Sequence, residues 1–260
     1  MIDAHVHIFR GNSEAYTVQH INRFVEKAQK KGITELYMLE HTHQFCEFEQ
    51  IYSPVIDSSE YLRNWLSGKL KASLESYMHF IDSVKDHSFP IKVKFGLEAC
   101  YISETEHVLA NLLKQYEWDF VTGSVHFVNN WGFDHKPELW YGIDIDEAYT
   151  QYYETMHKLI SSGLFSGVAH PDSIKCFGHY PSGDMSSTYT ALAEALNNAG
   201  MYAEQSGGLV LNYGASELGL NSVMLKIFKN KNVRLLTASD AHVPEHAGAN
   251  IRELQAILDV

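Results

Sequence analysis

The chain has 260 residues, of which 45% are hydrophobic and 20% charged, and its formal charge is −12. This composition excludes a disordered chain, because the hydrophobic content is high and the net charge per residue is low. The sequence has no apolar run of about 18 residues, which excludes a membrane-spanning helix. It also lacks the dense Lys/Arg stripe on which sequence-independent nucleic-acid binding relies, so nucleic acid is a disfavoured partner.

The cysteines and the first residues indicate a cellular compartment. Cys46, Cys100 and Cys176 are far apart and include no CxxC pair, which fits a reducing cytosol and argues against a disulfide framework. The opening MIDAHVHIF lacks the basic stretch and apolar core of a signal peptide. We therefore expect a cytoplasmic protein that has no membrane partner.

Short apolar runs rich in β-forming residues alternate with amphipathic segments along the chain. The runs predict strands at 4–9, 34–41, 92–100, 119–127, 165–170, 201–206 and 233–242. The spacing predicts helices at 18–31, 60–86, 104–116, 146–162, 187–199, 222–229 and 250–258. Such alternation is typical of a parallel sheet. Because no GxGxxG, GxxxxGK[ST] or GxSxG motif occurs, it favours a closed α/β barrel, and the absence of linkers favours a single domain over 1–260.

The 15 histidines divide into two groups. Five lie in expected helices and are interpreted as surface or packing residues: His20, His79, His87, His107 and His157. Most of the others lie in or just after expected strands, and six strands end with His, Glu or Asp. Active sites of α/β barrels lie at the C-terminal ends of their strands. This placement predicts one shared site.

The motifs at these strand ends offer only nitrogen and oxygen donors. His5 and His7 point to the same face of a strand, where Asp3 is expected to orient a ring. The remaining donors are His41 and His43, Glu98, His126, His170, Asp240 and His242. Each alone also fits a paired surface or loop residue. Together they predict a polynuclear site for Zn, Mn or Fe(II), because imidazole and carboxylate suit these ions.

In this order, the motifs DAHVH, LEH, GLEA, GSVHF, AHPD and SDAH resemble the PHP (polymerase and histidinol phosphatase) family. The stretches GSVHFVNNWGFDH and AHPDSIKCFGHYP resemble its histidinol-phosphatase branch. The resemblance implies a distorted (β/α)7 TIM-like barrel that holds two to three divalent metal ions. It assigns the first ion to His5, His7, Glu98 and Asp240, the second to Glu98, His126 and His170, and the third to His41, His242 and a residue after HxH.

The loop after HxH departs from the family pattern. Many relatives place a His there, whereas this chain reads IFRGNSEAY, in which Glu14 is the only strong ligand. Either Glu14 substitutes for the missing His, or water or His43 fills the position, or the third site is weak.

The resemblance implies hydrolysis of a phosphate monoester, with histidinol phosphate as the suggested small phosphorylated substrate. Two ions bridged by Glu98 would activate water and neutralise phosphoryl oxygens. The expected catalytic residues are Glu98, Asp240, His242 and His43, and His43, His242 or a bound water would protonate the leaving group. The expected substrate contacts are Arg10, His43, His135, Lys175 and His179, with Glu204 and Ser206 facing the amine or hydroxyl of the substrate.

Other functions are compatible with parts of this pattern. One is a PHP phosphoesterase for another small phosphate or a nucleotide, and another is a nuclease or polymerase-proofreading module, which the low Lys/Arg content disfavours. A third is a metal-dependent amidohydrolase on an eight-stranded barrel, and a fourth is a non-catalytic metal-binding protein. The sequence is compatible with a homo-oligomer.

Overall fold

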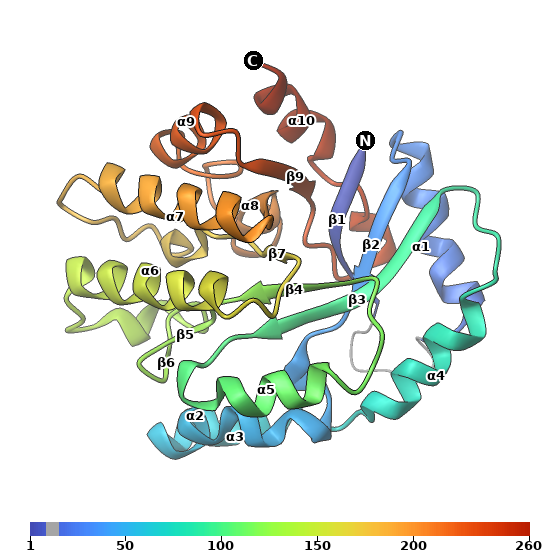
Figure 1. Cartoon of the computed structure of the whole chain (residues 1–260), viewed down its shortest axis with the longest axis horizontal. Coiled ribbons are helices and arrows are strands. Elements are labelled where there is room, and N and C mark those ends of the chain that lie inside the picture. Colours follow the sequence, from blue (N-terminus) through green and yellow to red (C-terminus); the bar gives the residue numbers. More distant parts are fainter. Residues whose placement is uncertain (9–15) are drawn as a thin grey trace.

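Seven parallel strands form one sheet in the order β1-β2-β3-β4-β7-β8-β9 (Figure 1). The computed structural model describes residues 1–8 and 16–260. The strands are β1 (Ile2–His7), β2 (Glu35–Leu39), β3 (Lys92–Cys100), β4 (Phe120–Ser124), β7 (Gly167–Val168), β8 (Tyr202–Ser206) and β9 (Arg234–Ala238). Each of the seven expected strand regions therefore overlaps a strand of this sheet, although β1 begins two residues before the expected start at residue 4.

The first and last strands of the sheet meet and close it into a barrel. The His7 N–H donates to the Ala241 carbonyl at 2.8 Å, and the Asp240 N–H donates to the His5 carbonyl at 3.0 Å. Below these bonds, the buried Asp3 carboxylate accepts hydrogen bonds from Ser239 N, Ser239 Oγ and Gly248 N at 2.7–2.8 Å. Asp3 thus binds the β1–β9 seam instead of orienting an imidazole as expected. Burial raises the pKa of Asp3 to about 6 despite these donors.

Helices cover the outside of the barrel (Figure 1). They include α1 (Val18–Lys30), α4 (Leu74–Val84), α5 (Glu106–Leu113), α6 (Ile145–Ser161), α7 (Ser186–Ala199), α9 (Ser222–Asn230) and α10 (Ile251–Asp259). In α1, Ile21, Phe24, Val25 and Ala28 form the buried stripe that the sequence pattern predicts. The helices and the outer face of the sheet share one large hydrophobic core. A second, smaller core contains only strand residues, as a filled barrel interior requires: Ala4, Tyr37, Leu39, Phe120, Tyr202 and Leu236.

The segment between β2 and β3 differs from the expected single helix at 60–86. It contains α2 (Ser53–Ser58), α3 (Glu60–Ser67) and α4, after short 3₁₀ segments at Thr42–Gln44 and Cys46–Tyr52. Helix α3 ends at Ser67 with Gly68 as its C-cap, and α4 begins after Ser73, whose hydroxyl caps the helix by accepting from Ser76 N. The apolar spacing continues across this break, which is why the pattern concealed it.

Two further elements were not predicted. The hairpin of β5 (Phe127–Val128) and β6 (Trp131–Gly132) follows β4, so the expected strand at 119–127 ends early. Helix α8 (Gly208–Tyr213) follows β8 directly. Across residues 1–8 and 16–260, no helix combines the length and hydrophobicity needed to cross a bilayer.

Candidate metal centre

The strand ends bring the predicted donors from across the sequence to one place. His5 and His7 lie on β1 and Glu98 on β3, and all three are buried. His41, His126 and His170 follow β2, β4 and β7, and Asp240 and His242 follow β9. Residues separated by more than two hundred positions therefore converge because parallel strands direct their C-terminal ends to one mouth of the barrel.

Glu98 lies at the centre of this cluster. Its Oε1 is 3.0 Å from His126 Nε2 and 3.1 Å from His170 Nε2. Its Oε2 is 3.1 Å from His41 Nε2, 3.3 Å from His5 Nε2 and 3.4 Å from His7 Nε2. The two oxygens thus face two different sets of imidazoles, which is the arrangement of a carboxylate able to bridge two ions.

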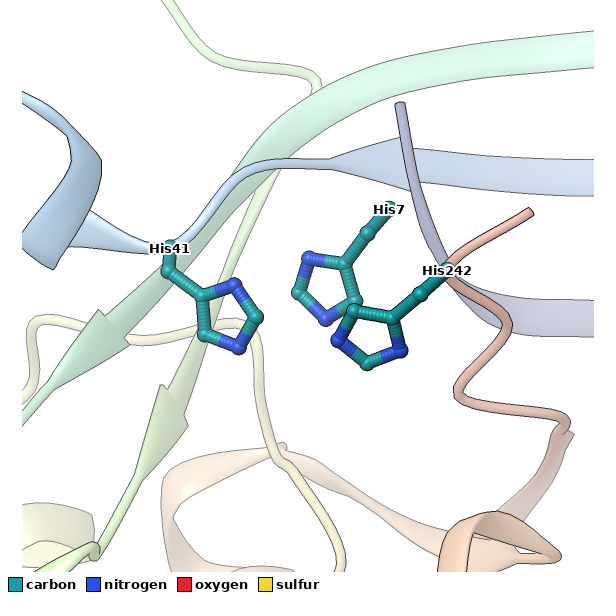
Figure 2. A group of neighbouring side chains, drawn as sticks. All are labelled: His7, His41 and His242. Atoms are coloured by element: carbon teal, nitrogen blue, oxygen red, sulfur yellow. The ribbon is translucent and has the colours of Figure 1, made fainter. Parts of the chain in front are cut away.

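Three groups of side chains place their donor atoms within 4.8 Å of one another: His5, His7 and Asp240; His5, Glu98 and His170; and His7, His41 and His242. Figure 2 shows the last group. The His7 ring lies 3.8 Å from that of His41 and 4.3 Å from that of His242, between centroids. Among the described residues, the donor that lies with His41 and His242 is His7. Glu14 lies outside the described residues.

Two of the donors have unusual backbone geometry. His170 has a φ of 28° and Asp240 a φ of 57°, in the left-handed region that side chains other than Gly rarely adopt. Strained backbone of this kind gathers at functional sites. Gly208 allows the close approach of Asp240, because a Cβ on Gly208 would lie 2.4 Å from Asp240 Oδ2. Asn212 Nδ2 donates to the same oxygen at 2.9 Å.

Two carboxylates hold imidazoles from behind. Glu204, which is fully buried, accepts from His5 Nδ1 at 3.0 and 3.1 Å and from His170 N at 3.1 Å. Asp134 accepts from His126 Nδ1 at 2.7 Å. Each bond leaves Nε2 of the ring directed at Glu98 and fixes the tautomer that can bind a metal. The expectation that Glu204 faces a substrate is wrong, because Glu204 is buried behind His5. Ser206 also differs from expectation, since its Oγ accepts from Gly208 N at 3.1 Å.

The charges of the cluster are strongly coupled. Burial alone would raise the pKa of Glu98, but His41, His5 and the other imidazoles hold it well below its ordinary value. Burial alone would lower the pKa of His5, but Glu204 and Glu98 hold it well above its usual range. Burial and neighbouring imidazoles lower the pKa of His7 and His41, which keeps these rings in the neutral form that binds metals.

These residues fit divalent metal ions. The buried Glu98 Oε2 accepts no hydrogen bond from a described residue, although three imidazole nitrogens surround it. His5 Nε2 and His7 Nε2 lie 3.0 Å apart and both face this oxygen and Asp240 Oδ1. Buried nitrogen and oxygen donors that face one another without polar partners are stable only when a cation or protons occupy the space between them.

A cavity of about 690 Å³ opens at this mouth and is lined by His41, His126, His170, Asp240 and His242. His43 and His135 also line it, and their contact with a substrate stays a prediction. His179 does not, and its ring stacks on Trp140 with a centroid distance of 4.4 Å. Arg10, like Glu14, lies outside the described residues.

Lys175 does not line the cavity either. Its buried ammonium lies 2.6 Å from both Asp172 and Glu217 and donates to the Gly219 carbonyl at 2.9 Å. These contacts differ from the expected contact with a phosphate, because the charge of Lys175 is already neutralised inside the protein. The cavity lining contains another cation, Lys69, together with Tyr61, Trp65 and Asp134. These four residues were not predicted from the sequence, although Asp134 lies in the stretch GSVHFVNNWGFDH.

The comparison with protein families decides the class of this chain. The model described as "PHP domain" matches residues 3–206. The chain belongs to the PHP domain family. Among curated relatives of this PHP chain, a "Probable histidinol-phosphatase" of Deinococcus radiodurans is 28% identical over 198 residues, which cover 71% of this chain and 72% of the relative. A protein of the same name from Schizosaccharomyces pombe is 25% identical over 182 residues, 65% of this chain and 60% of the relative.

Solved structures share the fold of this PHP chain. A putative histidinol phosphatase from Listeria monocytogenes superposes with a TM-score of 0.76 at 15% identity, covering 97% of this chain and 99% of the other. A histidinol phosphate phosphatase from Lactococcus lactis, complexed with zinc, L-histidinol and phosphate, gives a TM-score of 0.70 at 19% identity, covering 99% and 92%. The likeness confirms the predicted seven-stranded PHP barrel.

Proposed function

We propose that this PHP protein is a metal-dependent phosphomonoesterase and that its substrate is histidinol phosphate. The observation that carries the proposal is the convergence of imidazoles and carboxylates around the two oxygens of Glu98 at the mouth of the cavity. Two relatives, in bacteria and yeast, carry the name probable histidinol-phosphatase, which supports the choice of substrate.

Two to three ions of Zn, Mn or Fe fit the donors. His5, His7, Glu98 and Asp240 would hold one ion, Glu98, His126 and His170 a second, and His41 and His242 would contribute donors to a third. When bound, such ions acidify a water molecule and withdraw charge from phosphoryl oxygens. Glu204 and Asp134 keep Nδ1 of His5 and His126 protonated, so that Nε2 of both rings stays available.

His43 and His242 are less suited than water to protonating the leaving oxygen. Burial lowers the pKa of His43 to about 3, so this ring is neutral at pH 7 and serves as a hydrogen-bonding group on the cavity wall. His242 Nδ1 donates to the Asp240 carbonyl at 3.0 Å, which directs its Nε2 toward the centre. We therefore favour water, the third option, as the group that protonates the leaving oxygen.

The cavity walls suit the organic part of the substrate. The His135 ring lies 4.4 Å from Trp65 and 5.9 Å from Tyr61, between centroids, which forms an aromatic surface for a flat ring such as imidazole. The carboxylates of Asp134 and Asp240 also line the cavity and would attract an ammonium group. We place the enzyme in the cytosol, because its three cysteines are free. We treat residues 1–260 as one domain, because one seven-stranded sheet takes strands from the whole length of the chain.

The deciding experiment measures phosphate release from histidinol phosphate by metal-loaded protein, beside other small phosphate esters and nucleotides at equal metal content. We expect histidinol phosphate to give the highest kcat/KM. His126→Ala should reduce the rate by at least about a hundredfold, the effect of removing a group that acts on the transition-state charge. His107→Ala, on the exposed face of α5, is the matched control and should retain the full rate. Equal rates for His126→Ala and the unchanged protein would refute the proposal.

A further inference from the structure

The loop between α3 and α4, residues 68–73, is fixed against the strand end that carries His41 and His43. The Gln44 carbonyl accepts from Lys71 N at 3.0 Å and from Ala72 N at 2.8 Å, and Cys46 N donates to the Ala72 carbonyl at 3.0 Å. A parallel bridge between Phe45 and Ala72 continues the contact. The loop is therefore held by backbone bonds beside the metal centre.

Lys69 extends from this loop into the cavity lining. It is the one Lys or Arg among the lining residues that the structure describes. Its Nζ lies 5.6 Å from the centroid of the Trp65 ring, and its charge contributes to lowering the pKa of both His43 and His135. The ammonium is therefore near the rings of the inner wall and does not extend away from the cavity.

The charge of Lys69 is not neutralised by a described residue, since no carboxylate of residues 1–8 and 16–260 lies within ion-pair distance of it. Lys175 shows the contrast, because two carboxylates hold its ammonium. An unpaired ammonium beside a cavity binds anions, and phosphate carries two negative charges near neutral pH. The carboxylates of Asp134 and Asp240 lie on the same lining and repel a phosphate. The positive charge of Lys69 would offset this repulsion when such a ligand enters the cavity.

We propose that Lys69 binds the phosphoryl group of the substrate, donating from Nζ to an oxygen that the metal centre leaves free. The proposal rests on the proposed phosphatase function and adds the residue that recognises the phosphate dianion from the α3 side. The ammonium of histidinol phosphate would lie away from Lys69, because like charges repel.

The test uses inorganic phosphate, so that it does not depend on the organic part of the substrate. Calorimetry would measure the Kd of phosphate for the zinc-loaded protein and for Lys69→Met, Lys69→Gln and Lys69→Arg at equal zinc content. Loss of the ammonium should weaken binding about tenfold, equivalent to ~1.4 kcal/mol. Lys69→Arg should retain most of the affinity, because Arg keeps the charge. Lys71→Met, an exposed residue of the same loop outside the lining, is the matched control and should bind phosphate as the unchanged protein does.

The outcomes separate this proposal from the proposed function. If the Met and Gln variants bind phosphate as tightly as the unchanged protein, or if Lys71→Met weakens binding equally, Lys69 does not recognise phosphate. If histidinol phosphate is not hydrolysed but phosphate binding falls in both neutral Lys69 variants alone, the substrate assignment fails and the role of Lys69 stands. With an active enzyme, Lys69→Met should raise KM more than it lowers kcat.

Discussion

Glu204→Gln tests whether a buried carboxylate behind the cluster sets its affinity for metal. Glu204 accepts from His5 Nδ1 with both oxygens and from His170 N with one. A glutamine has one acceptor oxygen, so its amide NH₂ must face one of these two donors. The glutamine oxygen at the Oε2 position can still accept from both donors, but the buried NH₂ at the Oε1 position then faces the His5 Nδ1–H, donor against donor, and the carboxylate charge is lost, which costs about 1–3 kcal/mol. We expect the affinity for zinc to fall about 10- to 100-fold, the usual effect of removing the partner of a metal-binding His and equivalent to ~1.4–2.7 kcal/mol.

Competition with a chromogenic chelator would measure the zinc affinity, and elemental analysis would give the ions retained per chain. Glu194→Gln, which breaks an exposed ion pair with Lys231, is the matched control and should retain the full affinity. Circular dichroism of both variants in saturating zinc should match that of the unchanged protein. Equal zinc affinity for Glu204→Gln and Glu194→Gln would refute the view that Glu204 orients His5 toward the metals.

The remaining predictions concern stability and the position of Asp240. Lys175→Met should lower the free energy of unfolding by about 3–5 kcal/mol, because it leaves Asp172 buried without its cation. The rate of phosphate release per folded, metal-loaded molecule should be unchanged. A stable but inactive variant would contradict this prediction. Asp3 keeps its proton up to pH ~6 in the folded chain, whereas in the unfolded chain it loses the proton near its ordinary pKa. As the pH rises from 4 to 7, the free energy of unfolding of the metal-free protein should therefore fall by up to ~3 kcal/mol relative to that of Asp3→Asn. A difference in free energy of unfolding between the two proteins that stays constant over this pH range would contradict this prediction. Gly208→Ala should displace Asp240 and reduce the zinc bound per chain, and unchanged zinc content would show that the close approach is dispensable.

The strand ends were the most predictable part of the molecule. His5 and His7 share a face because strand side chains alternate, and short apolar runs that end in His, Glu or Asp indicate where each strand stops. Parallel topology then places those ends together, so the convergence around Glu98 follows from local patterns. The barrel followed from the same alternation of strands and helices.

The residues that support the centre were less predictable, because their partners are set by tertiary structure. Glu204 lies in the middle of β8, and its distance from the cavity depends on how β8 packs between β7 and β9 and faces His5 of β1. Lys175 looked like a loop cation until Glu217, 42 residues later, was placed beside it. Lys69 was hidden in an apparent helix at 60–86, since helical periodicity alone does not detect the break after Gly68.

The seam between β1 and β9 has a consequence for the order of events during synthesis. His5 lies on the first strand of the sheet, whereas Asp240 and His242 follow its last strand and are synthesised after the other donors. In a nascent chain, His5 and His7 are therefore exposed before Asp240 and His242, which complete the metal-binding groups, have been synthesised. The complete set of donors can therefore bind metal only after β9 has been synthesised.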